Sequence, residues 1–255
     1  MRSLPLLILA IWISSLLAGF ASEVTFVPGG KPLYPTGAPG WKYKLGTAEA
    51  STPVEAWRTN TFVEDGSWNN ASTPFGYVTG TPNDPNGFEA SLVTTIPTST
   101  VGNYLSVFMR RTFVVTNAVS FSSVTLGMAV DDGCVIWLNG QEVIPRLQCC
   151  QAEVNTGVDT TLPAFNADAT TTGESAPYTN AVMNTVAGPL REGTNVLCIQ
   201  LFNANLTSTE LVLDASLTGT IDDTVPTLFS QSPVPGTTVL SLSAIQVNFS
   251  EDVQG

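Results

Sequence analysis

The chain has 255 residues and is acidic, with 9 basic and 21 acidic side chains, a formal net charge of −12 and no histidine. Nucleic acids and anionic lipids are bound by clustered Lys and Arg, and only Arg110 and Arg111 are adjacent basic residues, so we expect neither as a partner. The absence of histidine excludes Ser-His-Asp and Cys-His catalysis and histidine-ligated zinc or iron sites.

Residues 1–21 have the features of a secretory signal peptide. Arg2 gives a positive start, Leu4 to Leu17 form an apolar run, and the small residues Gly19 and Ala21 suit a cleavage site. An uncleaved anchor is the alternative, but the run is too short for it. We therefore expect cleavage after Ala21, a secreted or cell-surface protein, and no membrane span in the mature chain.

The first half of the mature chain alternates between strand fragments and turns. Residues 22–40 are rich in Pro and Gly and are expected to form a leader ahead of the main domain, 41–221. That domain opens with a strand at Trp41–Gly46, and Asp65-Gly66 marks a later turn. Residues 80–87 consist almost wholly of Thr, Pro, Asn, Asp and Gly, as expected of a loop.

The stretch from Tyr104 to Val143 predicts three strands separated by two turns. Apolar residues alternate in its first two thirds, which is the pattern of a half-buried strand. Asp131-Asp132-Gly133 forms a corner, and Asn139-Gly140 is the strongest hairpin signal in the chain because both residues tolerate positive φ. The predicted strands cover residues 107–115, 124–130 and 134–138.

The remaining segments support an all-β fold. Residues 145–188 form a long polar loop, and apolar strands follow at Val196–Phe202 and Leu211–Leu217. Many short strands with turn signals between them predict an antiparallel β-sandwich. The runner-up is a mixed α+β fold with a helix within residues 175–190.

The C-terminal segment reads as a separate unit. Ile221–Pro226 is a change in composition that suggests a linker, and residues 226–255 contain about two predicted strands. So short a segment cannot form an independent sandwich. We expect it to be the N-terminal part of a second domain within a longer protein.

Five segments carry a resemblance to a known family. They are WKYKLGTAE, FVEDGSWNNASTPFGY, FMRRTFVV, AVDDGCVIWLNGQEV and EGTNVLCIQLFN, in this order. Residues 41–219 thereby resemble the galactose-binding-domain-like jelly roll of large secreted bacterial proteins, and more broadly the sugar-binding sandwich domains that precede the catalytic barrels of β-galactosidases. Residues 226–255 resemble the opening strands of a surface-layer-type bacterial Ig-like domain. The resemblance implies a non-catalytic module and no particular ligand.

Four cysteines distinguish this chain from that family. Cys134 and Cys198 stand where such domains more often have a small residue, and Cys149-Cys150 lies in the long loop. In a secreted chain we expect disulfides. One option pairs Cys134 with Cys198 and Cys149 with Cys150, and the other is crossed bridges from the loop to the strands.

Asp131 and Asp132 are the candidate metal ligands. Two adjacent carboxylates at a strand end suit Ca²⁺, which prefers several oxygen ligands. The pair also resembles the Asp-Asp calcium corner of lectin modules related to the anthrax protective-antigen domain. The simpler interpretation is a turn in which the Asp side chains bond their own backbone ahead of Gly133.

Aromatic and basic residues offer two further candidate sites. Aromatic side chains could stack on sugar rings, although core packing explains them as well, and for Trp68, Phe75 and Trp137 we expect burial. The aromatic candidates are Trp41, Trp57, Trp68, Tyr77 and Trp137. Arg110-Arg111 could clamp a carboxylate, although one Arg paired with an acid and one solvated Arg is the simpler expectation. Asn70, Asn205 and Asn248 begin N-x-S/T sequons, which matter only in a glycosylating host.

These observations predict a secreted or cell-surface, non-catalytic β-sandwich module that binds a polysaccharide or cell-surface glycan or acts in adhesion. The second hypothesis is an ancillary domain of a secreted glycoside hydrolase whose catalytic part lies beyond Gly255. The third is a purely structural spacer, because one fold serves all of these functions.

Overall fold

The computed structural model describes residues 22–29, 37–80, 89–116, 118, 121–144, 162–170, 179–183, 189–221, 227–236 and 244–250. Residues 22–222 form one compact unit, and residues 223–255 belong to a second. Each unit is described by itself.

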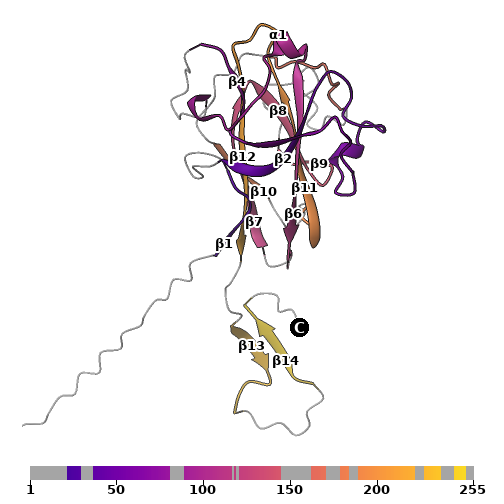
Figure 1. Cartoon of the computed structure of the whole chain (residues 1–255). Coiled ribbons are helices and arrows are strands. Elements are labelled where there is room, and N and C mark those ends of the chain that lie inside the picture. Colours follow the sequence, from indigo (N-terminus) through magenta and orange to yellow (C-terminus); the bar gives the residue numbers. More distant parts are fainter. Residues whose placement is uncertain are drawn as a thin grey trace, which may run out of the picture. The chain divides into compact units, whose positions relative to one another are not determined.

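The first unit is a sandwich of two six-stranded sheets (Figure 1). The first sheet has the order β10-β7-β12-β4-β5, with β1 also paired to β12, and the second has the order β3-β2-β6-β11-β8-β9. All strand pairs are antiparallel except β4 with β5. The first sheet consists of β1 (Glu23–Val27), β4 (Phe75–Val78), β5 (Thr94–Thr95), β7 (Phe121–Asp131), β10 (Thr179–Met183) and β12 (Glu210–Ile221). The second consists of β2 (Ala38–Leu45), β3 (Asn69–Thr73), β6 (Ser106–Val115), β8 (Gly133–Leu138), β9 (Gln141–Glu142) and β11 (Gly193–Phe202).

Helical structure in the described residues is limited to short turns. These are η1 (Ala56–Arg58), η2 (Glu89–Ser91) and α1 (Ser99–Gly102). None of the helices described is long and apolar enough to cross a membrane. The predicted all-β sandwich is therefore confirmed, and the helix expected within residues 175–190 is wrong, because Thr179–Met183 pairs with β7 as strand β10.

The core between the sheets follows from the two-residue period of the strands. Every second residue of a strand points to the same face, so alternating apolar residues line the interior. These buried residues come from both sheets: Val107, Met109, Phe113 and Val115 in β6, Val124, Leu126, Met128 and Val130 in β7, Leu197, Ile199 and Leu201 in β11, and Leu211, Leu213, Ala215 and Leu217 in β12. Burying each of the larger ones stabilises the fold by roughly 1.5–3 kcal/mol.

The stretch from Tyr104 to Val143 forms the predicted strands and connects the two sheets. β6 lies in the second sheet, β7 crosses to the first, and β8 returns to the second beside β11. The Asp131-Asp132 corner is the point of return. The chain also enters the sandwich earlier than expected, because β1, within the segment predicted to be a leader, pairs with β12.

A second apolar cluster covers the outer face of β6, β11 and β8. Trp57 and Trp68, from the segment between β2 and β3, pack there against residues that face away from the central core. The Trp57 ring lies 5.6 Å from the Trp137 ring and 5.2 Å from the Phe108 ring, both in edge-on geometry. The described residues 162–170 add Ala169, with Leu162, Phe165 and Ala167 partly buried. We call the segment 46–68 the covering loop.

Two asparagines fix the end of β8 against the start of β11. Asn139 has a φ of 53°, as the hairpin signal predicted. Its Oδ1 accepts from Val196 N at 3.0 Å, and its Nδ2 donates to Asn195 Oδ1 at 2.7 Å. Asn195 is fully buried and also accepts from Arg191 N and donates to Arg191 O and Gly193 O. The buried Asn195 amide therefore joins the backbone of Arg191 and Gly193, at the start of β11, to the Asn139 turn.

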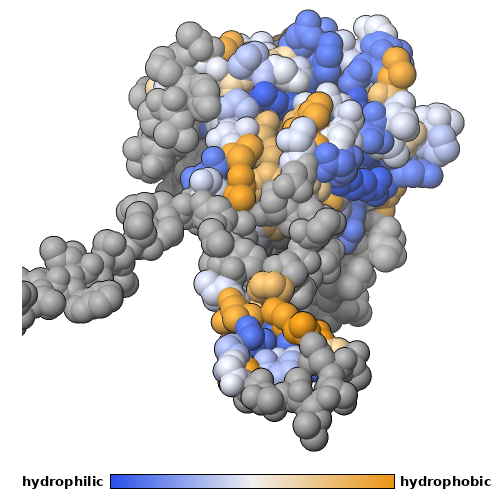
Figure 2. Space-filling model, turned by 90° about the horizontal axis from the view of Figure 1, so that it is seen from below, coloured by the Kyte–Doolittle hydropathy of each residue, from blue (hydrophilic) through white to orange (hydrophobic). Residues whose placement is uncertain are grey.

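The second unit contains a two-stranded hairpin among its described residues, formed by β13 (Leu228–Ser232) and β14 (Gln246–Phe249). Figure 2 shows apolar surface on this hairpin. The exposed large apolar residues of the unit's described part are Leu228, Phe229, Val234, Ile245, Val247 and Phe249. A two-stranded hairpin is marginally stable by itself. Its membership of an Ig-like domain stays a prediction.

We predict that Asn195→Ala lowers the free energy of unfolding by about 3 kcal/mol, because it removes four hydrogen bonds of a fully buried amide. Chemical denaturation measures the change. Asn69→Ala, at an exposed position of β3, is the control and should stay within about 0.5 kcal/mol of wild type. Equal effects of the two substitutions would show that the Asn195 bonds do not stabilise the fold.

Candidate functional site

The aromatic residues considered as sugar-stacking platforms are all in the interior. Trp41, Trp57, Trp68, Tyr77 and Trp137 are between 1% and 7% exposed. Core packing is therefore confirmed for all five, including the shared face of Val135 and Trp137, which lie in the outer cluster. The stacking interpretation is wrong for these residues, since a ring must be exposed to stack on a sugar.

Arg110 attaches the covering loop to the sheet. Its side chain is 1% exposed and points from β6 toward the loop. Nε donates to Trp57 O at 3.0 Å, Nη2 donates to Thr59 O at 2.8 Å, and Nη1 pairs with the Glu64 carboxylate. The expected pairing of one Arg with an acid is confirmed, while Arg111 is partly buried.

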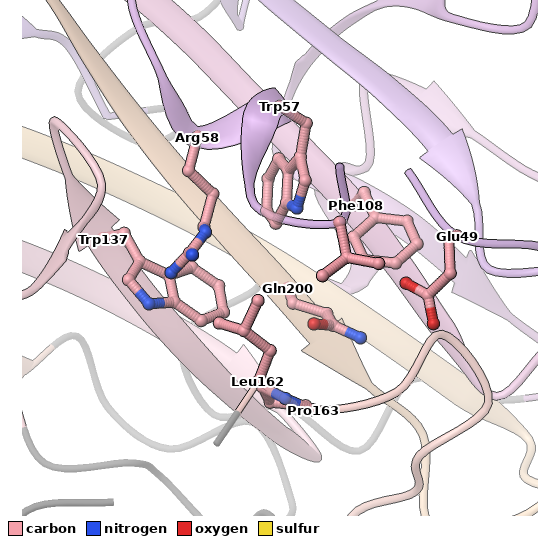
Figure 3. A pocket seen from close by; sticks show the side chains of 9 residues that line it. Glu49, Trp57, Arg58, Phe108, Trp137, Leu162, Pro163 and Gln200 are labelled. Carbon is pink, nitrogen blue, oxygen red and sulfur yellow. The ribbon is translucent and has the colours of Figure 1, made fainter. Parts of the chain in front are cut away.

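A small pocket opens where the covering loop meets the sheet (Figure 3). It holds about 10 Å³, which is room for about one water molecule. Arg58 and Trp137 lie on one side, Glu49 lies on the other, and Gln200 lies between them. The lining residues are Glu49, Val54, Trp57, Arg58, Phe108, Trp137, Leu162, Pro163 and Gln200.

Arg58 is the charged group of this pocket that the fold buries most. The side chain is 9% exposed, and its guanidinium carbon lies 5.0 Å from the centre of the Trp137 ring, a cation–π contact. Burial lowers the pKa of Arg58, and the charges of Glu55 and Glu142 oppose that shift. The guanidinium remains protonated at neutral pH, because the pKa of an arginine side chain lies far above neutrality.

A larger groove lies at β2 and β3, the edge of the second sheet. It holds about 320 Å³ and is lined by Pro39, Gly40, Trp41, Lys42, Asn70, Ala71, Ser72 and Thr94. Lys42 Nζ donates to Asn70 Oδ1 at 2.6 Å, and Ser72 N donates to Thr94 Oγ1 at 2.7 Å. We call this the edge groove. Its lining offers hydrogen-bond donors and acceptors and contains no carboxylate.

One irregularity of the strands leaves backbone polar groups near the edge groove outside the ladder, and one lining side chain has a buried donor. The pairing of β2 with β3 shifts register between Pro39 and Trp41, and such irregularities leave backbone groups outside the ladder. The Trp41 indole Nε1 is buried and has no hydrogen-bond partner within the described part of the chain. The sequence did not single out Lys42, and it marked Asn70 only as a sequon.

The Asp131-Asp132 corner is buried, and one carboxylate oxygen of Asp132 accepts a hydrogen bond from a backbone amide far along the chain. The two residues are 1% and 5% exposed, and Asp132 Oδ2 accepts from Ala204 N at 2.7 Å. Ca²⁺ takes about six to eight oxygen ligands, and no group of three or more His, Cys, Asp or Glu able to hold a metal occurs among the described residues. The calcium site stays a prediction.

The predicted disulfides between strands are not formed. Cys134 and Cys198 are both buried free thiols. In the β8–β11 ladder Cys134 lies opposite Leu201 and Cys198 opposite Trp137, and the two side chains pack in different clusters on opposite faces of the sheet. That geometry forbids a Cys134–Cys198 bridge, and the free thiols exclude crossed bridges in this structure. Cys149 and Cys150 lie outside the described residues.

Comparison with known proteins gives only distant matches. No family model and no curated protein matches the chain. Similar solved structures include a Bacteroides uniformis β-glucuronidase, with a TM-score of 0.42, 14% identity, and coverage of 78% of this chain and 18% of that chain. An uncultured Clostridium sp. β-glucuronidase has a TM-score of 0.42 and 12% identity, with coverage of 90% of this chain and 34% of that chain. A Dictyoglomus thermophilum β-D-mannosidase has a TM-score of 0.33 and 16% identity, with coverage of 71% of this chain and 16% of that chain. The chain thus spans a third or less of these proteins, and at these scores the function must be argued from its own residues.

We predict that Arg110→Met lowers the free energy of unfolding by about 3 kcal/mol, because two loop carbonyls and Glu64 lose a buried charged donor. The free energy of unfolding of Arg110→Lys should lie between those of wild type and Arg110→Met, since an ammonium keeps the charge but cannot reproduce the fork of a guanidinium. The control is Arg191→Met at an exposed arginine, with a change within about 0.5 kcal/mol in the same denaturation assay. A small loss for Arg110→Met would contradict the anchoring role.

We predict that the Cys134 and Cys198 thiols are inert in the folded protein. Burial raises the pKa of each to about 12. In a Cys149→Ser/Cys150→Ser variant, a thiol reagent at neutral pH should react with both only after denaturant is added. If neither Cys134 nor Cys198 reacts with the reagent in denaturant, the two form a disulfide, and the prediction of free thiols is wrong. The folded state keeps protons that the unfolded thiols release above their ordinary pKa of 9.0, so the free energy of unfolding should fall as the pH rises from about 9 toward 12.

Proposed function

We propose that this protein is a secreted or cell-surface, non-catalytic β-sandwich module that binds a neutral carbohydrate in the edge groove. The groove carries the proposal. Its volume of about 320 Å³ lies at the lower end of the range of about 300–1,000 Å³ that small-molecule sites occupy. It is large enough for one sugar ring but not for a long chain.

The chemistry of the groove supports a neutral polyol as ligand. Lys42, Asn70, Ser72 and Thr94 supply donors and acceptors of the kind that sugar hydroxyls need. Lys42 and Asn70 already bond each other, so a ligand must exchange that contact for its own hydroxyls. Lys42 is the sole charged residue of the lining, and most of the polar groups there are neutral, as the hydroxyls of a neutral sugar are.

The same lining argues for binding without catalysis. Hydrolysis of a glycosidic bond normally uses two carboxylic groups on either side of that bond. The lining of the edge groove includes no Asp or Glu. The groove therefore suits recognition of a sugar that another domain or protein processes, and such a partner domain would lie beyond this chain.

The hairpin of the second unit supports a place within a larger protein. Leu228, Phe229 and Phe249 expose apolar surface that further strands would bury. We propose that residues 226–255 belong to an Ig-like domain in a multidomain extracellular protein. The sandwich would then be the glycan-binding part, and the Ig-like part would hold it at a distance from the cell or from a catalytic domain.

We predict that Lys42→Ala weakens binding to a glycan selected from a polysaccharide and glycan array by about tenfold, because it removes a charged donor from the groove. Lys44→Ala is the matched control. It removes the same charge from the same strand, but Lys44 does not line the groove and contacts Ala50 O instead. Titration calorimetry on both variants, with melting temperatures to confirm folding, decides the question. Equal losses would place the sugar elsewhere, and an array without any binding would leave only a structural role.

A further inference from the structure

Two arginines, Arg58 of the covering loop and Arg110 of β6, lie beside the outer cluster, and only Arg110 has hydrogen-bond partners for its guanidinium among the described residues. Arg110 uses its guanidinium for hydrogen bonds to Trp57 O and Thr59 O and for the pair with Glu64. Arg58 has no hydrogen bond or ion pair from its guanidinium to any described residue, and its Nε is completely buried without a partner. A guanidinium carries five donors, and leaving them unpaired in a buried position costs free energy.

The unpaired guanidinium faces the pocket shown in Figure 3. The face of Trp137 fixes one side of Arg58, so the guanidinium plane is held in place without using its donors. Gln200 also lines the pocket but does not pair with Arg58 in this structure, and its Nε2 donates to Ala164 O at 3.0 Å and Ser106 Oγ at 3.3 Å. The pocket thus presents a preorganised cation with free donors at its surface.

Size and charge select the kind of group that can bind Arg58. A space of about 10 Å³ admits the end of a ligand and excludes its body. Glu49 lines the other side of the pocket, and Glu55 and Glu142 act on Arg58 through their charges. Repulsion from these three acids grows with the charge of the ligand, which disfavours a doubly charged sulfate or phosphate. A planar, singly charged carboxylate matches the guanidinium fork through two parallel hydrogen bonds.

We propose that Arg58, held against Trp137, is a binding site for the carboxylate group of an acidic ligand. The site is separate from the edge groove, with no residue in common. It does not depend on the proposed binding of a neutral sugar there. The carboxylate can belong to an acidic sugar or to a small free acid, and both sources present the same planar group to Arg58.

The test is a titration of the full-length ¹⁵N-labelled protein, observed at the assigned Arg58 Nε–Hε resonance. Sodium galacturonate is compared with galactose, which has the same ring without the carboxylate, and with sodium acetate, sodium sulfate and sodium chloride. We expect saturable shifts with galacturonate and acetate, no shift with galactose, and weaker binding of sulfate. Tighter binding of galacturonate than of acetate identifies an acidic sugar as the source, and the reverse order identifies a small free acid.

Three variants separate this site from a general effect of charge. Arg58→Lys keeps the charge but lacks the planar fork of the guanidinium, and we expect it to bind either carboxylate about tenfold more weakly. Because this variant has no Arg58 resonance, its binding is followed at the indole N–H resonance of Trp137, which lies against residue 58. Arg191→Met and Lys42→Ala should bind as wild type does. The proposal is overturned if neither carboxylate gives a saturable shift, if sulfate binds more tightly than both, or if Arg58→Lys binds unchanged. The titration of the wild-type protein remains decisive even if a variant folds poorly.

Discussion

The contact between Arg110 and the covering loop is the interaction on which the outer half of this molecule depends. A single buried guanidinium on β6 holds Trp57 O, Thr59 O and the Glu64 carboxylate, which lie 46 to 53 residues away in sequence. Burying a charge is costly unless it is paired and hydrogen-bonded. The fold meets that condition here, and as a result an irregular segment lies in one defined position on the sheet.

The position of the loop determines what the outer face of the second sheet can do. With the loop in place, Trp57 packs edge-on against Trp137 and Phe108, and the face becomes a second core. The same placement turns the next residue, Arg58, over Trp137 and leaves it unpaired at a pocket. The sheet therefore does not bind ligands across an open aromatic face. The two sites proposed above are this pocket and the edge groove at β2 and β3.

Much of the sandwich could be predicted from local pattern, and the sites could not. Alternating apolar residues predicted β6 and β7, and Asn139-Gly140 predicted the turn after β8. These predictions were possible because each pattern involves only residues that are close in sequence. β10 has no such pattern and becomes a strand by pairing with β7. Predicting that Cys134 and Cys198 are free thiols would have needed the register of β8 on β11, because that register places the two side chains on opposite faces of the sheet. Arg58 became a candidate only once the distant Arg110 contact had placed it.

Hydrogen exchange of the backbone amides in Arg110→Met tests the central claim most directly. In wild type the amides of Trp57, Arg58 and Thr59 are hydrogen-bonded to Ser51 Oγ, Glu55 O and Ala56 O, and should be protected. The account predicts that in the variant these amides exchange much faster, by about a hundredfold, while those of the β6–β11 ladder keep most of their protection. Unchanged protection in the loop, or an equal loss in the loop and the ladder, would contradict it.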